Sequence, residues 1–160
     1  MLPRHFAVSC VENPPIVGVM PFPARYLLVD DSSQDRLLAQ EAFEALCPDC
    51  TLTCVESGRE ALALFDDPAF DPDVILLDLN MPGMNGFEVL RVLKDNPRLV
   101  HIPVVILSTS AAQQDVSEAY TLHASSYLVK SDNFTEFLQQ VETFLRYWQL
   151  SRTIRIQPIG

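Results

Sequence analysis

The stretch that decides the fold is Leu76-Leu77-Asp78-Leu79-Asn80-Met81-Pro82-Gly83-Met84-Asn85-Gly86. An apolar run that begins at Val74 ends abruptly at Asp78, and a Pro-Gly turn follows before a helical pattern starts. A short aliphatic run bounded by turn residues is typical of a strand buried on both faces. A carboxylate that directly follows such a strand lies at the carboxyl edge of a sheet, where open α/β folds place their chemistry.

Strands and helices alternate from residue 25 to about residue 150. The expected strands cover residues 26–30, 51–55, 74–77, 104–107 and 127–129, and the expected helices cover residues 33–46, 57–65, 87–93, 113–122 and 133–150. This alternation predicts an α/β fold whose five-stranded parallel sheet is covered on both faces, and right-handed crossovers make it doubly wound. The expected strand order is 2-1-3-4-5, which is flavodoxin-like.

Length and composition describe one acidic domain. The chain has 160 residues, of which 48% are hydrophobic, and a formal net charge of −10. Such a charge repels nucleic acid, so we expect no nucleic-acid partner. No apolar run reaches the ~18 residues of a membrane span, and without an export signal we expect a cytoplasmic protein. We expect a flexible Pro-rich tail over residues 1–24, the domain over residues 25–150 and a short tail over residues 151–160.

The four cysteines are Cys10, Cys47, Cys50 and Cys54, and in a cytosolic protein we expect reduced thiols. Cys47 and Cys50 have the spacing of a redox motif, but they follow a predicted helix rather than lead into one. Such a connection lies at the amino ends of the strands, far from Asp78. Zinc would need a fourth ligand with matching spacing, which the sequence does not offer.

Three carboxylates are expected to meet at the carboxyl edge of the sheet. Asp30 and Asp31 end the first strand, and in the order 2-1-3-4-5 this strand is the neighbour of the one that ends at Asp78. Close carboxylates repel one another unless a cation lies among them. Oxygen ligands with open coordination positions suit Mg²⁺.

Two further polar residues end strands at the same edge. Ser108 follows the fourth apolar run and Lys130 follows the fifth. Each alone is typical of an ordinary turn or surface residue. Together with the carboxylates they supply what phosphoryl transfer needs, with Asp78 as the nucleophile and with Lys130 and Ser108 binding phosphoryl oxygens.

The segment around Asp78 and the ordered set Asp30-Asp31, Asp78, Ser108 and Lys130 resemble the receiver domains of bacterial response regulators. The resemblance covers residues 25 to about 148. It implies a single-domain response regulator that accepts phosphate on Asp78 from a sensor histidine kinase, and that is a phosphoacceptor rather than an enzyme.

The resemblance also implies a metal site and a switch. Mg²⁺ would be bound by Asp31, Asp78 and the backbone carbonyl of Asn80, with Asp30 acting through a water molecule. After phosphorylation Ser108 would move toward the phosphoryl group and Tyr127 would swing inward. The surface over the fourth helix, fifth strand and fifth helix would then change.

Three departures from the family pattern stand out. Ser131 replaces the usual proline after the lysine, and because a cis bond without proline costs ~2.5–4 kcal/mol, we expect a trans Lys130–Ser131 peptide. His123-Ala124 stands where a glycine is common. The chain also continues into Arg146-Tyr147-Trp148. This extension, with residues 102–110, is similar to the stand-alone regulators paired with bacterial phytochromes, which implies a phytochrome as the kinase.

The last helix predicts a homodimer. Its apolar residues recur at helical spacing, and beyond Phe144 we expect the helix to overrun the sheet. Leu145, Tyr147, Trp148 and Leu150 would then be exposed and form the dimer interface. A two-fold pairing of this helix with its mate is the simplest closed arrangement.

Three alternatives remain open. A phosphatase of the haloacid-dehalogenase type also uses a strand-end aspartate, but it usually needs a second Asp as general acid where this chain has Asn80. An FMN-binding module would need a phosphate loop after the first strand, where Asp30 and Asp31 would repel the phosphate. A structural dimer that no longer signals would not need the acidic and Ser/Lys set.

Overall fold

The computed structural model describes residues 19–20, 23–151 and 153–154. Its main sheet has five parallel strands: β2 (Arg25–Val29), β3 (Thr51–Val55), β4 (Val74–Leu77), β5 (Val104–Ser108) and β6 (Ser126–Val129). They are hydrogen-bonded in the order β3-β2-β4-β5-β6, which confirms the predicted 2-1-3-4-5 arrangement. The helices are α2 (Ser33–Leu46), α3 (Gly58–Leu64), α4 (Gly86–Asp95), α5 (Gln113–Thr121) and α6 (Phe134–Gln149).

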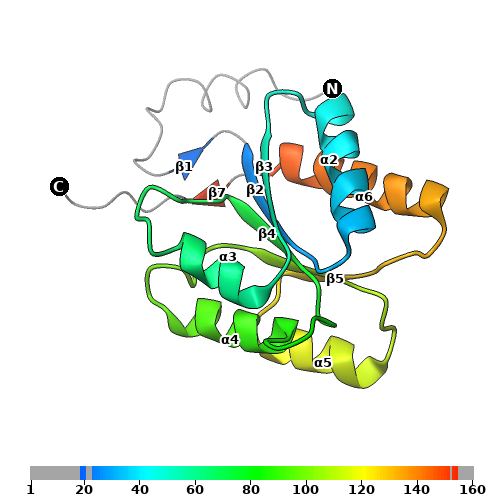
Figure 1. The fold of residues 1–160 in the computed structure, drawn as a ribbon. Helices are drawn as coiled ribbons and strands as arrows, with labels where there is room; N and C mark the ends of the chain where they lie inside the picture. Colours follow the sequence, from blue (N-terminus) through cyan, green and yellow to red (C-terminus); the bar gives the residue numbers. More distant parts are fainter. Residues whose placement is uncertain (1–18, 21–22, 152, 155–160) are drawn as a thin grey trace, which may run out of the picture.

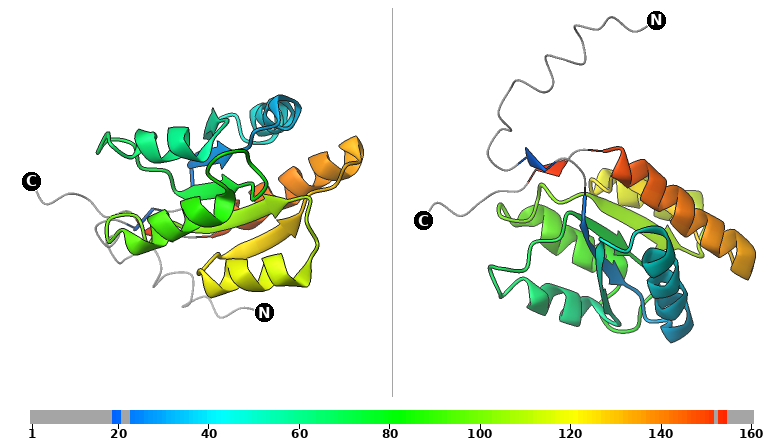
Figure 2. Two further views of the ribbon diagram at one scale, coloured as in Figure 1. Left: turned by 60° about the horizontal axis from the view of Figure 1, so that its bottom comes forward. Right: turned by 90° about the horizontal axis from the view of Figure 1, so that it is seen from above.

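The sheet is covered on both faces (Figures 1 and 2). Helices α2 and α6 pack on one face, and α3, α4 and α5 pack on the other. The strand side chains alternate between the two layers, so that Leu27 and Val29 point to one core while Tyr26 and Leu28 point to the other. All four residues of the central strand β4 are buried, as expected for a strand with helices on each side.

Side-chain caps begin four of the helices. Ser32, Ser57, Asn85 and Asn133 each accept a hydrogen bond from the backbone N–H three residues later, at 3.0–3.2 Å. Such caps satisfy N–H groups that have no partner within the helix. Because each of these helices follows a strand, the caps also fix the loops that leave the carboxyl edge of the sheet.

Cys47 and Cys50 are joined by a disulfide, so the expectation of reduced thiols is wrong for this pair. The turn that ends α2 explains the contact, because the Cys50 N–H donates to the Cys47 carbonyl and the two Cα atoms lie 5.3 Å apart. That separation is within the usual range for a disulfide. The pair directly precedes β3, at the amino edge as predicted. Cys54 is not in a disulfide, and Cys10 lies outside the described residues.

A second, two-stranded sheet was not foreseen from the sequence. β1 (Val19–Met20) pairs antiparallel with β7 (Thr153–Ile154), which joins the two segments expected to be tails. The rest of both predicted tails, apart from residues 23–24 and 151, lies outside the described residues. Within the part of the chain that the structure describes, no helix is long and apolar enough to cross a membrane.

The expected exposure of α6 is wrong for two of its residues. Leu145 is 1% exposed and Trp148 8%, because both pack in the core that α6 shares with α2 and the sheet. The Phe144 ring links this end of α6 to the sheet, since it lies 5.8 Å from the Tyr26 ring and 6.3 Å from the Trp148 ring. The helix therefore does not overrun the domain at these positions. Tyr147 and Leu150 are exposed, as predicted.

Candidate functional site

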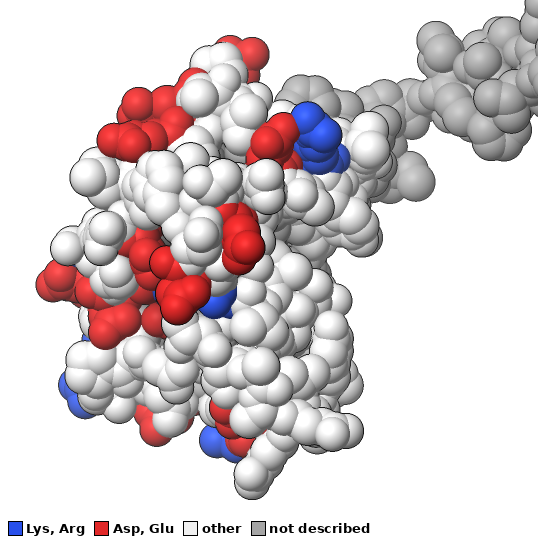
Figure 3. Space-filling model, turned by 90° about the vertical axis from the view of Figure 1, so that its right-hand side faces the viewer, with Lys and Arg blue, Asp and Glu red and all other residues white. Residues whose placement is uncertain are grey.

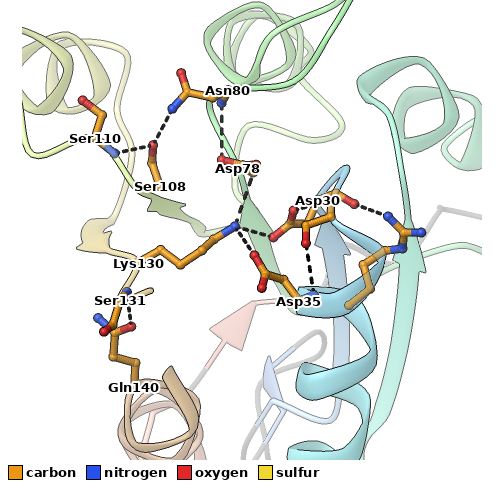
Figure 4. A network of polar contacts seen from close by, with 11 residues as sticks. Asp30, Asp35, Asp78, Asn80, Ser108, Ser110, Lys130, Ser131 and Gln140 are labelled. Atoms are coloured by element: carbon orange, nitrogen blue, oxygen red, sulfur yellow. Dashed lines mark hydrogen bonds and ion pairs between the residues drawn. The ribbon is translucent and has the colours of Figure 1, made fainter. Parts of the chain in front are cut away.

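The strand-end residues meet as predicted at the carboxyl edge of the sheet (Figure 4). Asp30 follows β2, Asp78 follows β4, Ser108 ends β5 and Lys130 follows β6. Backbone hydrogen bonds between neighbouring strands align these ends: the Asp78 N–H donates to the Val29 carbonyl, and the Lys130 N–H donates to the Ser108 carbonyl. All four side chains are buried, which is unusual for three charged groups and a hydroxyl.

The three predicted acidic residues form one cluster. Asp30, Asp31 and Asp78 each place a carboxylate oxygen within 4.8 Å of the others. Asp31 is exposed, whereas Asp30 and Asp78 are buried. Acidic side chains also gather on the side of the molecule shown in Figure 3, where basic side chains are few.

Lys130 lies among carboxylates. Its Nζ donates to Asp30 at 2.7 Å and to Asp35 at 2.9 Å, and it lies 3.9 Å from Asp78 Oδ2. Asp35 is not among the site residues expected from the sequence. A signal was available, because Asp35 lies in the first turn of the helix that follows Asp30-Asp31, and this turn must also lie at the carboxyl edge.

A second polar chain leads away from Asp78 on the other side. The Asn80 N–H donates to Asp78 Oδ1 at 3.3 Å, and the Asn80 side-chain amide donates to Ser108 Oγ at 3.3 Å. The Ser110 N–H also donates to Ser108 Oγ, at 3.2 Å. Tyr127 is half-buried and its hydroxyl donates to the Ser110 carbonyl at 2.8 Å. The two predicted switch residues are therefore connected through the loop that follows β5.

Burial sets the electrostatics of the cluster. It raises the pKa of Asp78 to about 6, with Lys130 acting in the opposite direction and Asp30 adding to the rise. Burial also raises the pKa of Asp30, although the hydrogen bond from Lys130 opposes this. Burial would lower the pKa of Lys130, but its hydrogen bonds to Asp30 and Asp35 and the charge of Asp78 raise it overall. The lysine thus stays charged.

The residues present fit a divalent cation. Three carboxylates lie within reach of one ion, and burial together with the neighbouring Asp30 disfavours the charged form of Asp78 and raises its pKa, which a bound cation would oppose. Carboxylate oxygens are the ligands that Mg²⁺ and Mn²⁺ prefer. The described contacts of Asn80 involve its N–H and its side chain, so a role for its backbone carbonyl stays a prediction.

Gln140 holds the loop after β6, in which Ser131 follows Lys130. No peptide bond among the described residues is cis, which confirms the trans Lys130–Ser131 bond. The Ser131 N–H donates to Gln140 Oε1 at 3.0 Å, and the Gln140 amide donates back to Val129. His123, at the position where the family often has glycine, adopts a positive φ of 67°. This backbone conformation is uncommon for a residue with a side chain.

We predict that Asp78→Asn stabilises the metal-free protein near neutral pH. The pKa of this Asp is about 3.9 in the unfolded chain and about 6 in the folded protein. The free energy of unfolding is therefore lowered at any pH at which Asp78 is ionised. The penalty is absent below about pH 4, grows between pH 4 and 6 and is complete above pH 7. The variant should then gain about 3 kcal/mol in the free energy of unfolding.

Urea unfolding in EDTA at pH 4 and pH 7.5 would measure this difference. An equal gain at both pH values would show that the charge of Asp78 is not its cause. A loss of stability at pH 7.5 would contradict the penalty itself.

Known proteins resemble this chain over most of its length. The response regulator receiver domain family matches residues 26–142. The response regulator Rcp1 of Synechocystis sp. is 38% identical over 146 residues, which cover 88% of this chain and 94% of Rcp1. The phosphorylated cyanobacterial phytochrome response regulator RcpA is 37% identical with a TM-score of 0.75, over 79% of this chain and 94% of RcpA.

The crystal structure of the Mn²⁺-bound form of Rcp1 has a TM-score of 0.77 and 37% identity, over 84% of this chain and all of that one. Its metal is of the kind that the acidic cluster described above would suit. The family match covers most of the chain, and Asp30, Asp31, Asp78, Ser108 and Lys130 all lie within it. This chain therefore belongs to the family of response regulator receiver domains.

Proposed function

We propose that this receiver accepts a phosphoryl group on Asp78 from a sensor histidine kinase and that it requires Mg²⁺ to do so. The observation that carries the proposal is the buried Asp78 carboxylate, which shares a cluster with Asp30 and Asp31 and lies 3.9 Å from the Lys130 ammonium. A nucleophile, a set of cation ligands and a cationic partner for the phosphoryl group are thus within reach of one another.

In the proposed reaction a carboxylate oxygen of Asp78 attacks the phosphorus of the kinase's phosphohistidine. An O–P bond forms and the P–N bond breaks, and the imidazole nitrogen leaves with the electron pair and takes up a proton. Bound Mg²⁺ would neutralise charge on the phosphoryl oxygens. Lys130 and Ser108 would each pair with a phosphoryl oxygen. Because the pKa of Asp78 is about 6, its carboxylate is in the reactive, deprotonated form at neutral pH.

The proposal is tested by treating the purified protein with acetyl phosphate, a small acyl phosphate, in the presence of Mg²⁺ or of EDTA. Intact-mass spectrometry should show one added phosphoryl group with Mg²⁺ and none with EDTA. Fragmentation after borohydride reduction should locate the group on Asp78. Labelling that is unaffected by EDTA, or that is located elsewhere, would contradict the proposal.

We predict that Asp31→Asn weakens Mg²⁺ binding more than Asp30→Asn does. Asp31 is exposed and proposed as a direct ligand, whereas the Asp30 oxygens already accept from Lys130 and from the Ser32 N–H. A residue that acts through water should cost roughly tenfold in affinity, and a direct ligand more. Isothermal titration calorimetry of the two variants and the wild type would measure this. Unchanged affinity in both variants would rule out the site.

The identity of the kinase is part of the proposal. RcpA is described as a phytochrome response regulator and matches this chain over 94% of its own length, which supports a bacterial phytochrome as the phosphate donor. The match over 94% of Rcp1 likewise supports a regulator organised as Rcp1 is. The signal would leave through α5, β6 and α6. Tyr127 lies on β6 and is connected to Ser108 through Ser110, and Gln140 of α6 is hydrogen-bonded on both sides of Lys130, to Val129 and Ser131.

We also propose a homodimer that uses the end of α6. Since Leu145 and Trp148 are buried, the interface would rest on Tyr147 and Leu150, which are 64% and 85% exposed. Large apolar side chains with such exposure are typical of partner surfaces when they lie together.

We predict that Leu150→Glu converts the dimer to a monomer, because a charge would be buried in the interface. Sedimentation velocity at tens of micromolar concentration, with and without phosphorylation, would show the change. Leu37→Glu is the matched control, since Leu37 is also exposed but lies on α2. A monomeric wild type in both states would contradict the dimer.

A further inference from the structure

The ammonium group of Lys130 has a partner that does not come from a strand end. Asp35 lies in the first turn of α2, and its Oδ2 accepts from Lys130 Nζ at 2.9 Å. The other short contact of the ammonium is with Asp30, at 2.7 Å, while Asp78 lies 1.0 Å farther away than Asp35 does, at 3.9 Å. In this arrangement the Lys130 ammonium is hydrogen-bonded to Asp30 and Asp35 and not to the proposed phosphoacceptor Asp78.

Asp35 is well fixed in this position. Its own N–H donates to the Oγ of Ser32, the residue that caps α2, so the backbone that carries the carboxylate is anchored. Its side chain is 25% exposed, and that of Lys130 is 6% exposed. Water therefore screens this ion pair less than it screens a pair on the open surface.

Asp35 and a phosphoryl group compete for the same cation. An ammonium has three donors, and two of them are directed at Asp30 and Asp35 in this structure. A phosphoryl group on Asp78 adds negative charge on that side of the ammonium and draws it toward Asp78, and such a movement lengthens its contacts on the other side. Asp30 belongs to the acidic cluster proposed for the cation, whereas Asp35 is outside that cluster. Its described side-chain contact is with Lys130.

We propose that Asp35 is a positioning residue that holds Lys130 back from Asp78, so that phosphorylation must break the Lys130–Asp35 ion pair. The inference rests on the proposed phosphoacceptor function. It makes the first turn of α2 a part of the site that responds to phosphorylation. When Lys130 moves to the phosphoryl group, Asp35 loses its partner and the charge at the start of α2 changes.

The experiment measures binding of trifluoroberyllate, a phosphoryl analogue, to the full chain in Mg²⁺ by calorimetry. Asp35→Asn keeps the shape of the side chain and removes the ion pair, so it should bind the analogue roughly five-fold more tightly than the wild type, the gain expected for a modest ion pair. Asp35→Glu, which restores the charge, should return the affinity toward that of the wild type. Asp132→Asn, which removes an exposed carboxylate two residues after Lys130, should have no such effect.

A double-mutant cycle separates positioning from a general change in charge. If Asp35 acts through Lys130, Asp35→Asn should no longer change the affinity when Lys130 is replaced by Met. The same four proteins are compared by thermal unfolding without ligand, where the two substitutions should also be non-additive. This second measurement does not depend on the affinity of the Lys130→Met proteins for the analogue.

Each outcome decides the inference. Equal affinity of the wild type and Asp35→Asn overturns it, and so does a gain that persists in the Lys130→Met background, because the effect would then be through-space charge alone. If the wild type binds the analogue with Mg²⁺, such a result leaves the proposed function intact. If the wild type does not bind the analogue at all, the proposed function and the inference are both overturned.

Discussion

Asp78→Asn is expected to abolish phosphoryl transfer to this chain while leaving the fold intact. The amide has nearly the shape of the carboxylate, but its oxygen is a poor nucleophile and it carries no charge to bind a cation. Neither neighbouring carboxylate can replace it easily. The Asp30 carboxylate is 1% exposed and accepts from Lys130 and from the Ser32 N–H, and the exposed Asp31 lacks the buried setting beside Lys130 that Asp78 has.

The measurement is intact-mass spectrometry after treatment with acetyl phosphate and Mg²⁺, with the wild type and Asp132→Asn labelled in parallel. The added phosphoryl mass should be absent from Asp78→Asn and present in both others. Circular dichroism would establish that the variant is folded. Labelling of Asp78→Asn to the level of the wild type would show that the phosphoacceptor is another residue.

The sequence predicted the site well because four of its residues follow strands directly. A buried strand is recognisable as a short apolar run, and parallel neighbours end at the same edge. The position of Asp30, Asp78, Ser108 and Lys130 in three dimensions therefore follows from the strand order alone. Predicting that side chains at such positions lie close together requires no knowledge of how the helices pack.

The contact between Asp35 and Lys130 could not be predicted in this way. The place of Asp35 in the first turn of a helix at the carboxyl edge was predictable, but its contact with Lys130 depends on the path of a long, flexible side chain. The two residues are 95 positions apart in the sequence. A pattern of apolar residues determines where backbones lie, and it does not specify which of several carboxylates an ammonium group selects.

The corrections to α6 and to the cysteines have a similar origin. Helical spacing identified the apolar side of α6. How far the domain extends beneath that side depends on how α2 and α6 pack against each other, and the spacing of residues in one helix does not specify this. Leu145 and Trp148 are thus buried in a core to which α2 contributes. For Cys47 and Cys50 the expectation of reduced thiols rested on the expected compartment, which does not contain the tight turn at the end of α2 that brings the sulfurs together.

The structure also bears on the alternative of a haloacid-dehalogenase type of phosphatase. Such an enzyme needs a proton donor two residues after its nucleophile, and here Asn80 holds that position. Its side-chain amide donates to Ser108, so it connects Asp78 to the loop after β5 instead of delivering a proton. This contact fits a site that receives and holds a phosphoryl group better than one that hydrolyses phosphate esters.

Gly86→Ala is expected to disrupt the site by displacing the backbone segment that carries Asp78. Gly86 begins α4, and its N–H donates to the Leu79 carbonyl at 3.0 Å, so the start of the helix lies directly against the segment that follows Asp78. A Cβ at this position would collide with the Asp78 carbonyl oxygen and lie 2.7 Å from Leu79 Cα. These are backbone atoms, so relief requires α4 or the Asp78 segment to shift.

We therefore expect Gly86→Ala to lose stability at the upper end of the range of about 1–3 kcal/mol that overpacking costs, and also to lose phosphoryl acceptance as Asp78 is displaced. Urea unfolding and labelling with acetyl phosphate would measure both effects. Gly83→Asn is the matched control in the same loop. Gly83 has a positive φ of 77° but open space around its would-be Cβ, and asparagine tolerates that conformation. If Gly86→Ala were as stable and as readily labelled as Gly83→Asn, close approach of α4 would not be what positions Asp78.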